Sequence, residues 1–300
     1  MARVALVLGS GGARGYAHIG VIDELEARGH DIVAISGCSM GAVIGGIYLA
    51  GQLESYRRWV SKLKTLDILR LLDFSWESSG AIRGVKIMRR LGRLTDEFNI
   101  EDLPAPLTIV ATDMTRQREL WFQSGSLSDA IRASIAIPGI MTPVEQQGRF
   151  LVDGGLLNPL PILPAVASHD ADIIIAVNAT ATSPKNVTLE ELLPSPTEIK
   201  VETEESWFSS LRKRFSSDDA TQAPSAQALG KLDLMLKAFD ITQAALAQYK
   251  IAGYPPDVLI NVPKSVCGTH EFQRATPMIE LGRHLARDAL DRFEAGYSEG

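Results

Sequence analysis

The stretch Ile32-Val33-Ala34-Ile35-Ser36-Gly37-Cys38-Ser39-Met40-Gly41-Ala42-Val43 decides how the chain folds. Its first half is a β-branched apolar run ending at Ser36, which predicts a buried strand. The segment from Ala42 to Leu49 begins directly after Gly41 and has the period of a helix. Between the two, Gly37-x-Ser39-x-Gly41 has the spacing of a nucleophile elbow, a turn so tight that its flanking positions tolerate almost no side chain. We therefore expect Ser39 at a sharp turn, with its hydroxyl clear of the sheet and facing solvent.

A glycine-rich loop, Gly9-Ser10-Gly11-Gly12-Ala13-Arg14-Gly15, follows the apolar run from Val4 to Leu8. The run predicts a strand buried on both faces, and the loop leads into a helix that reaches about Arg28. Free backbone N–H groups at the start of a helix stabilise negative charge. The loop is therefore suited to hold either a phosphate or an oxyanion.

Two features argue against a phosphate-binding role for this loop. A dinucleotide fingerprint counted from Gly9 places Arg14 where the third glycine belongs, and the second strand closes with Ser36-Gly37 instead of an acidic residue. An oxyanion site asks only for two N–H donors beside the end of the next strand, which is where Ser39 lies. The competing interpretation is a non-catalytic α/β module that binds a nucleotide or phosphate at this loop.

A second candidate is Asp153-Gly154-Gly155, which closes the segment Arg149 to Asp153. That segment and Pro143 to Glu145 are predicted to form a hairpin across Gln146-Gln147-Gly148. An aspartate followed by two glycines is often only a turn. Downstream of an elbow serine without an obvious histidine, however, Asp153 becomes the candidate base.

A serine hydroxyl is a weak nucleophile until a neighbouring group takes its proton. Only His169, His270 and His284 follow Asp153, as the Ser, Asp, His order of α/β-hydrolases would require, and none has distinctive surroundings. In addition, only two predicted strands precede Ser39, whereas several strands precede the nucleophile elbow in α/β-hydrolases. A dyad in which Asp153 accepts the proton is therefore favoured over a triad. The ordinary aspartate pKa of about 3.9 makes a feeble base, so positioning and partial dehydration must assist.

Composition narrows the function classes. With 300 residues and 45% apolar content, residues 1–300 suit a single large domain. A net charge of −6 gives no basic footprint for nucleic acid. Cys38 and Cys267 have neither metal-site spacing nor a disulfide pattern, which favours a reducing compartment, and Cys38 is expected to be a packing residue. No apolar run approaches the ~20 residues of a membrane span. We expect a cytoplasmic protein without a metal, another cofactor or a nucleic-acid partner.

The remaining sequence alternates strand and helix patterns. Helical periodicity is expected over Leu53 to Trp76, Lys86 to Leu94, Leu229 to Tyr249 and Pro277 to Phe293, and after a capping pattern at Ser126-x-x-Asp129. Strands are expected over Leu107 to Thr112, Glu119 to Gln123, Ile173 to Asn178 and Asp257 to Val262. The glycines Gly45 and Gly46 indicate close packing of the helix after the elbow. The apolar stripe that contains Leu63 and Leu66 either covers the core or flanks an acyl-binding cleft.

Residues from about 180 to 225 are rich in Ser, Pro, Thr, Glu and Lys, which predicts a mobile insertion. Within it, Ser206 to Phe215 combines bulky apolar and basic residues at helical spacing. This pattern favours either an interfacial helix or a short lid that packs back on the domain.

Three motifs together resemble the patatin-like phospholipase family, and within it the bacterial branch similar to neuropathy target esterase. They are Gly11-Gly12-x-Arg14-Gly15, Gly37-x-Ser39-x-Gly41 and Asp153-Gly154-Gly155, in that order. The resemblance covers about Val4 to Asn178 and extends through Gly253-Tyr-Pro-Pro-Asp257 to the last helix. Ser10 stands where many members have a further glycine, which affects the fine geometry of the loop.

The resemblance implies a three-layer α/β/α fold with a mainly parallel central sheet. It implies a Ser39–Asp153 dyad that hydrolyses acyl esters or phospholipids through an acyl-serine. Gly11 and Gly12 would supply oxyanion N–H groups, and Arg14 would organise the loop. Gly15 and Met40 are assigned to the same oxyanion and substrate-binding region, and Gly37 and Gly41 to the elbow. The implied substrate, a lipid or other acyl ester, suggests peripheral contact with the inner face of a membrane.

Overall fold

A computed structural model describes residues 1–71, 84–167, 170–183, 187–193 and 231–298. Its centre is one eight-stranded sheet in the order β5-β6-β3-β2-β1-β7-β8, with β4 on the other edge of β3. The strands are β1 (Arg3–Leu8), β2 (Asp31–Cys38), β3 (Leu107–Asp113), β4 (Arg118–Phe122), β5 (Val144–Gln146), β6 (Arg149–Asp153), β7 (Ile173–Ala181) and β8 (Val258–Pro263). From β3 through β8 the sheet is parallel, and β4, β5 and β6 add antiparallel pairs at one end.

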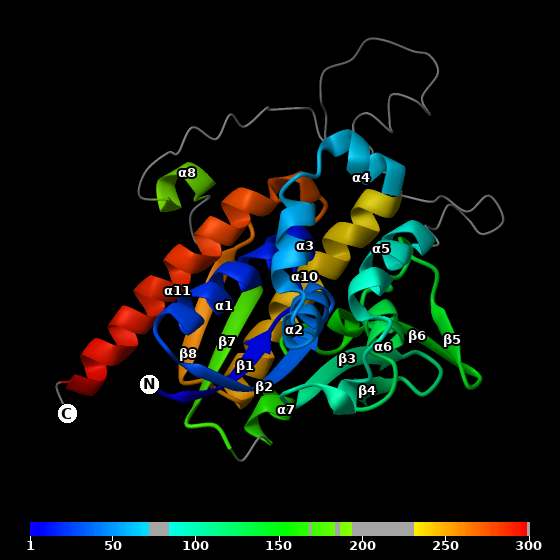
Figure 1. Cartoon of the computed structure of the whole chain (residues 1–300). Coiled ribbons are helices and arrows are strands. Elements are labelled where there is room, and N and C mark those ends of the chain that lie inside the picture. The colour runs from blue at the N-terminus through cyan, green and yellow to red at the C-terminus, as the bar shows by residue number, and fades with distance from the viewer. Residues whose placement is uncertain (72–83, 168–169, 184–186, 194–230, 299–300) are drawn as a thin grey trace, which may run out of the picture.

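Helices cover both faces of this sheet (Figure 1). They are α1 (Ala17–Ala27), α2 (Met40–Leu49), α3 (Leu53–Val60), α4 (Thr65–Leu71), α5 (Val85–Thr95), α6 (Leu127–Ser134), α7 (Ile162–Val166), α8 (Leu189–Leu192), α10 (Lys231–Gly253) and α11 (Ala275–Ser298). Along β1, Leu6 and Leu8 point into the core shared with α1, α2 and α11, while Ala5 and Val7 point into the core shared with α7 and α10. Alternate residues of a strand face opposite ways, so a continuous apolar run is buried on both sides. The predicted three-layer α/β/α fold with a mainly parallel sheet is confirmed.

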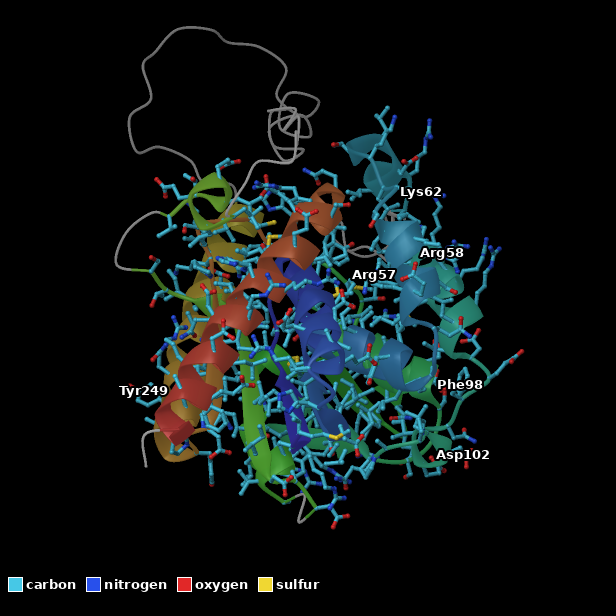
Figure 2. The ribbon with its side chains drawn as sticks, turned by 60° about the vertical axis from the view of Figure 1, so that its left-hand side comes forward. Arg57, Arg58, Lys62, Phe98, Asp102 and Tyr249 are labelled. Carbon is cyan, nitrogen blue, oxygen red and sulfur yellow. The ribbon has the colours of Figure 1, made fainter. Side chains whose placement is uncertain are left out.

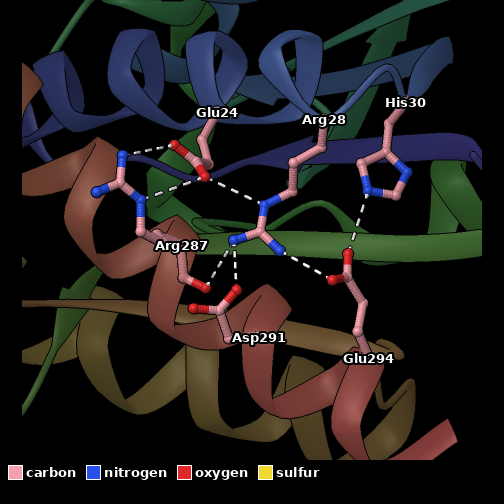
Figure 3. A network of polar contacts seen from close by, with 6 residues as sticks. All are labelled: Glu24, Arg28, His30, Arg287, Asp291 and Glu294. Carbon is pink, nitrogen blue, oxygen red and sulfur yellow. Dashed lines mark hydrogen bonds and ion pairs between the residues drawn. The ribbon is translucent and has the colours of Figure 1, made fainter. Parts of the chain in front are cut away.

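Two helices from opposite ends of the chain, α1 and α11, pack with their backbones in contact. A Cβ added at Gly20 would lie 1.9 Å from the carbonyl oxygen of Ile279, and one added at Gly282 would lie 2.0 Å from that of Ala17. Figure 3 shows the polar network beside this contact, in which the guanidinium of Arg28 bonds Glu24, Asp291 and Glu294. Arg287 reaches the same Glu24 carboxylate. The last helix, α11, therefore completes the helical layer that α1 and α2 form on one face of the sheet.

Two strands meet end to end beside β3. Cys38, the last residue of β2, is paired with Val110, and Asp153, the last residue of β6, is paired with Ala111. Because β2 is parallel and β6 antiparallel to β3, their carboxyl ends approach each other along the same edge. This arrangement brings Ser39 and Asp153 together across 114 positions of sequence.

The predicted helix from Leu53 to Trp76 is wrong as one element. It is interrupted after Val60, and α4 begins again at Thr65 with the Asp67 carboxylate accepting the N–H of Lys64. This local bond stabilises a new helix start. Residues 72–76 lie outside the described part. In the stripe, Ile68 is buried and Leu63 packs on the core, whereas Leu66 is 65% exposed.

The predicted insertion contains regular secondary structure near its start. Strand β7 continues to Ala181, and α8 follows with a reciprocal capping box between Thr188 and Glu191. Leu189 on this helix is buried in the main core. The segment from Ser206 to Phe215 lies outside the described residues, so its interfacial role stays a prediction. No helix in the described ranges is long and apolar enough to cross a membrane.

Candidate active site

The turn between β2 and α2 holds Ser39 with φ 53° and ψ −119°. A non-glycine residue at positive φ is uncommon and is held there only by the surrounding structure. A Cβ at Gly37 would lie 2.7 Å from the backbone of Gly41, and a Cβ at Gly41 would lie 1.9 Å from the carbonyl oxygen of Leu8. Both flanking positions therefore exclude any side chain, as the Gly-x-Ser-x-Gly pattern predicts.

Close packing continues along α2. A Cβ at Gly45 would meet the Ile35 side chain at 2.8 Å, and one at Gly46 would meet Leu127 at 2.9 Å. The expected close approach of this helix to its neighbours is confirmed. Because α2 begins at Met40 with Ser39 as its N-cap, the positive end of the helix dipole lies at Ser39.

The Ser39 hydroxyl donates to Oδ2 of Asp153 at 2.6 Å. The other carboxylate oxygen, Oδ1, accepts the backbone N–H of Gly155 at 2.7 Å. Asp153 is fully buried and Ser39 is 5% exposed. The expectation of a solvent-facing Ser39 is therefore wrong, because β6 and the end of α6 bring Asp153 and Ser134 against the turn.

Burial dominates the electrostatics of Asp153. Loss of hydration raises the pKa of its carboxyl to about 7, although the hydrogen bonds from Ser39 and from the Gly155 N–H act to lower it. A carboxylate with a pKa near neutrality is a much better proton acceptor than an ordinary aspartate. The site supplies through desolvation what the residue type lacks.

The glycine-rich loop lies beside the elbow because β1 and β2 are neighbours and Leu8 is paired with Gly37. Within this loop, the N–H groups of Gly9, Ser10, Ala13 and Arg14 donate to backbone carbonyls. Among the described residues, the N–H groups of Gly11 and Gly12 have no acceptor. Gly12 has φ +57°, and a Cβ there would lie 2.3 Å from the carbonyl oxygen of Thr269. The sequence and the packing thus leave two adjacent donors for an anion.

The other predicted site residues surround this loop. Gly15 packs on Met40, since a Cβ at Gly15 would lie 2.3 Å from Cγ of Met40. The buried guanidinium of Arg14 donates to Oδ1 of Asp240 at 2.7 Å and to the carbonyl of Lys264 at 3.4 Å. Arg14 thereby ties the loop to α10 and to the segment after β8, while Met40 connects it to the turn.

Two residues of the site were missed by sequence reasoning. Ser134, the last residue of α6, accepts the N–H of Ser39 at 2.9 Å and donates to the carbonyl of Val110 at 2.7 Å. Gln243, buried on α10, donates to Oγ of Ser10 at 3.1 Å. Its amide also fills the space beside Gly155, where a Cβ would lie 2.0 Å from Nε2. Neither residue has a local signal, because a helical serine and glutamine are usually exposed.

The histidines and Cys38 have other surroundings. His18 donates from Nε2 to the carbonyl of Gly9 at 2.8 Å, and burial lowers its pKa to about 4. His284 lies 3.5 Å from Asp288 on the same helix, and His169 lies outside the described residues. Burial, and then the nearby Asp153, raise the pKa of the Cys38 thiol well above its usual range. Cys38 therefore stays protonated, as a packing residue would.

No group of three or more His, Cys, Asp or Glu residues in the described ranges is arranged to hold a metal ion. The site instead consists of a buried serine–carboxylate pair beside a glycine loop, on a parallel sheet covered by helices. This defines an α/β protein with a serine at a strand-to-helix turn.

Comparisons with known proteins narrow that class. Residues 6–166 match the family model described as patatin-like phospholipase. An uncharacterized NTE family protein of Mycobacterium tuberculosis is 43% identical, covering 97% of this chain and 92% of the relative. The chain therefore belongs to the patatin-like phospholipase family, which supports lipid hydrolysis at the level of the family.

More distant relatives agree on the family and the fold. Patatin-like phospholipase domain-containing protein 6 of Mus musculus is 34% identical over 58% of this chain and 13% of that protein. The crystal structure of VipD from Legionella pneumophila superposes with a TM-score of 0.52 at 17% identity, covering 96% of this chain and 66% of that one. The latter similarity concerns the fold alone.

Proposed function

We propose that the protein is a serine acyl-ester hydrolase acting on phospholipids, lysophospholipids or simpler acyl esters. The observation that carries this function is the 2.6 Å hydrogen bond from the Ser39 hydroxyl to the buried Asp153 carboxylate. Family membership and the pKa of Asp153 support the same assignment.

The reaction begins when Oδ2 of Asp153 takes the hydroxyl proton of Ser39 as Oγ attacks the ester carbonyl carbon. The N–H groups of Gly11 and Gly12 hold the resulting oxyanion, which carries the electron pair of the former C=O π bond. Collapse of this intermediate breaks the bond to the leaving oxygen, and protonated Asp153 gives its proton to that alcohol. Water then repeats the two steps on the acyl-serine, releasing the acid and regenerating Ser39.

Two variants test the assignment on p-nitrophenyl esters of graded chain length and on phospholipids. Ser39→Ala should abolish hydrolysis without loss of folding, and Asp153→Asn should be nearly as damaging because an amide cannot accept the proton. Cys38→Ala, which changes the neighbouring thiol, is the matched control and should retain most activity. Wild-type turnover in folded Ser39→Ala would overturn the proposal.

The competing function, a nucleotide- or phosphate-binding module, is separated by a different measurement. Nucleotides and inorganic phosphate should leave the melting temperature of the wild-type protein unchanged. A ligand-dependent rise in melting temperature that is lost on substitution of Gly12, together with an absence of esterase activity, would favour the binding module.

A further inference from the structure

The basic rim is a cluster of cationic side chains on α3, α4, the loop between them, and α5. It consists of Arg57, Arg58, Lys62, Lys64, Arg70, Lys86, Arg89, Arg90 and Arg93. The described residues 53–71 and 84–95 contain only two carboxylates, Glu54 and Asp67. The whole chain has a net charge of −6, so the local excess of positive charge in these helices is opposite in sign to the net charge of the chain.

Much of this charge is not neutralised by ion pairs. Arg57 bonds Asp23, and Arg70 lies 3.5 Å from Asp67. Within the described residues, six of the nine cations have no carboxylate within ion-pair distance: Lys62, Lys64, Lys86, Arg89, Arg90 and Arg93. All of these except the half-buried Arg90 are exposed. A cluster of positive charges at the surface creates a potential that attracts an anionic partner.

The geometry of α5 separates its charges from its apolar side chains. At about 100° per residue, Lys86, Arg89, Arg90 and Arg93 fall within an arc of about 100°. On the other side, Leu91 is buried, and Ile87, Met88 and Leu94 pack against the main core. Arg90 lies over the ring of Trp59, 5.3 Å from its centroid, which joins α5 to α3. The helix therefore turns a basic face outward.

The basic rim stands at the end of the sheet where Ser39 lies. Helix α3 returns toward the carboxyl ends of the strands, and Tyr56 brings its hydroxyl to 3.8 Å from the sulfur of Met40, next to Ser39. Lys62 follows further along the chain. Figure 2 shows Arg57, Arg58 and Lys62 in succession toward the end of the molecule that carries α4, with Asp102 at the opposite end.

Two large apolar side chains project among these cations. Leu66 on α4 is 65% exposed and Val85 at the start of α5 is 49% exposed. Such apolar side chains would add little to the binding of a nucleic acid. The interfacial region of a bilayer, by contrast, accepts apolar side chains that are flanked by basic residues. Charge and apolar exposure together therefore favour lipid over nucleic acid.

We propose that the basic rim docks the protein on an anionic lipid surface, with Leu66 and Val85 entering the interfacial region. This inference rests on the proposed function, because it specifies that the ester substrate is presented at a negatively charged lipid surface. Docking here turns the carboxyl end of the sheet, and with it Ser39, toward the lipid.

The test measures binding separately from hydrolysis. Full-length Ser39→Ala protein is sedimented with vesicles of phosphatidylglycerol and phosphatidylcholine, or of phosphatidylcholine alone, and it should bind the anionic vesicles preferentially. A triple variant, Lys62→Gln, Lys64→Gln and Arg89→Gln, should bind them roughly a hundredfold more weakly, since each basic residue near an anionic surface contributes about fivefold. The matched control replaces three exposed cations outside the rim, Arg116, Arg118 and Arg292, by Gln and should bind as the parent does.

Three results of the binding experiments would overturn the inference: equal binding to both vesicle types, equal losses in the two triple variants, or rim-dependent binding to an oligonucleotide without vesicle binding. With Ser39 present, the rim variant should hydrolyse a soluble short-chain ester at the wild-type rate. A loss there would also contradict docking, since it would mean that the rim shapes the site. Vesicle binding without any esterase activity would instead overturn the proposed function and leave the docking surface standing.

Discussion

Ser39 combines a constrained backbone with a buried hydroxyl. Its positive φ aims the side chain away from the direction of β2, toward the end of β6. A conformation of this kind costs of order 1–3 kcal/mol and persists because the fold determines it elsewhere. The requirement for two flanking glycines follows directly, since Gly41 has the backbone of β1 against it.

The pKa of Asp153 predicts the pH dependence of catalysis. In the proposed mechanism the carboxyl must be ionised to take the proton from Ser39, and burial raises its pKa to about 7. The ratio kcat/KM for a soluble ester should therefore rise through about pH 7 and then level off, since this ratio reports ionisations of the free enzyme. Initial rates over the range from about pH 5 to about pH 9 measure it. A flat profile over that range would contradict Asp153 as the base.

The same shift predicts a pH dependence of stability. The folded pKa of about 7 lies above the unfolded value, so folded Asp153 binds a proton that the unfolded chain has released. Its contribution to stability is complete below about pH 4 and is lost as the pH rises through about 7. Denaturant unfolding at several pH values should show that the free energy of unfolding of Asp153→Asn increases relative to that of the wild-type protein as the pH rises over this range. A constant difference between the two proteins would contradict the raised pKa.

Ser134 is predicted to act through the backbone of the turn. In Ser134→Ala the Ser39 N–H and the Val110 carbonyl lose a buried partner, which should lower the free energy of unfolding by about 2 kcal/mol. We also expect a lower kcat, because the turn is less firmly held. Ser128→Ala on the same helix is the control and should change neither quantity. Equal stability of the two variants would show that the Ser134 bonds contribute nothing net.

At the scale of elements, α1 and α11 depend on backbone contact. Gly282→Ala should destabilise the protein by about 2 kcal/mol or more, because the added methyl group overlaps the carbonyl of Ala17. Gly296→Ala, in the same helix with nothing within 4 Å, should be neutral or stabilising by up to about 1 kcal/mol. Thermal and denaturant unfolding compare them. If both variants gained stability, the contact of α1 with α11 would be looser than described.

Helix α10 links the two loops of the site through Gln243. In Gln243→Leu the hydroxyl of Ser10 loses its partner and the packing beside Gly155 changes, so kcat should fall more than KM rises. The exposed neighbour variant Gln248→Leu is the control. Ser10→Gly should reduce the further effect of Gln243→Leu, since coupled residues are not additive. Full additivity would indicate that the two side chains act independently.

At the scale of the whole molecule, charge asymmetry predicts a salt effect. Hydrolysis of anionic vesicles should fall as ionic strength rises, because the basic rim and the lipid surface are exposed and screened. Hydrolysis of a soluble ester should be insensitive, since the Ser39–Asp153 pair is buried. Paired assays from low to about 0.5 M salt measure both, and they need no variant. Parallel losses on the two substrates would point to a salt effect on the site itself.

Local patterns predicted most of the elements correctly. Continuous apolar runs identified the buried strands β1, β2 and β7, and the Ser126 cap of α6 is present. The single helix expected from Leu53 failed because one bond between Asp67 and the Lys64 N–H starts a new helix there. Helical period alone does not reveal such an interruption.

The sequence by itself determined the turn at Ser39, because only glycine satisfies the contacts at Gly37 and Gly41, and it marked Asp153 as a partner candidate. Only the tertiary structure decided that the two side chains meet, since this depends on β2 and β6 ending head to head beside β3. It likewise decided the pKa of Asp153, the positions of Ser134 and Gln243, and the basic rim. These properties arise from burial and from distances between segments far apart in the chain, which residue order alone does not contain.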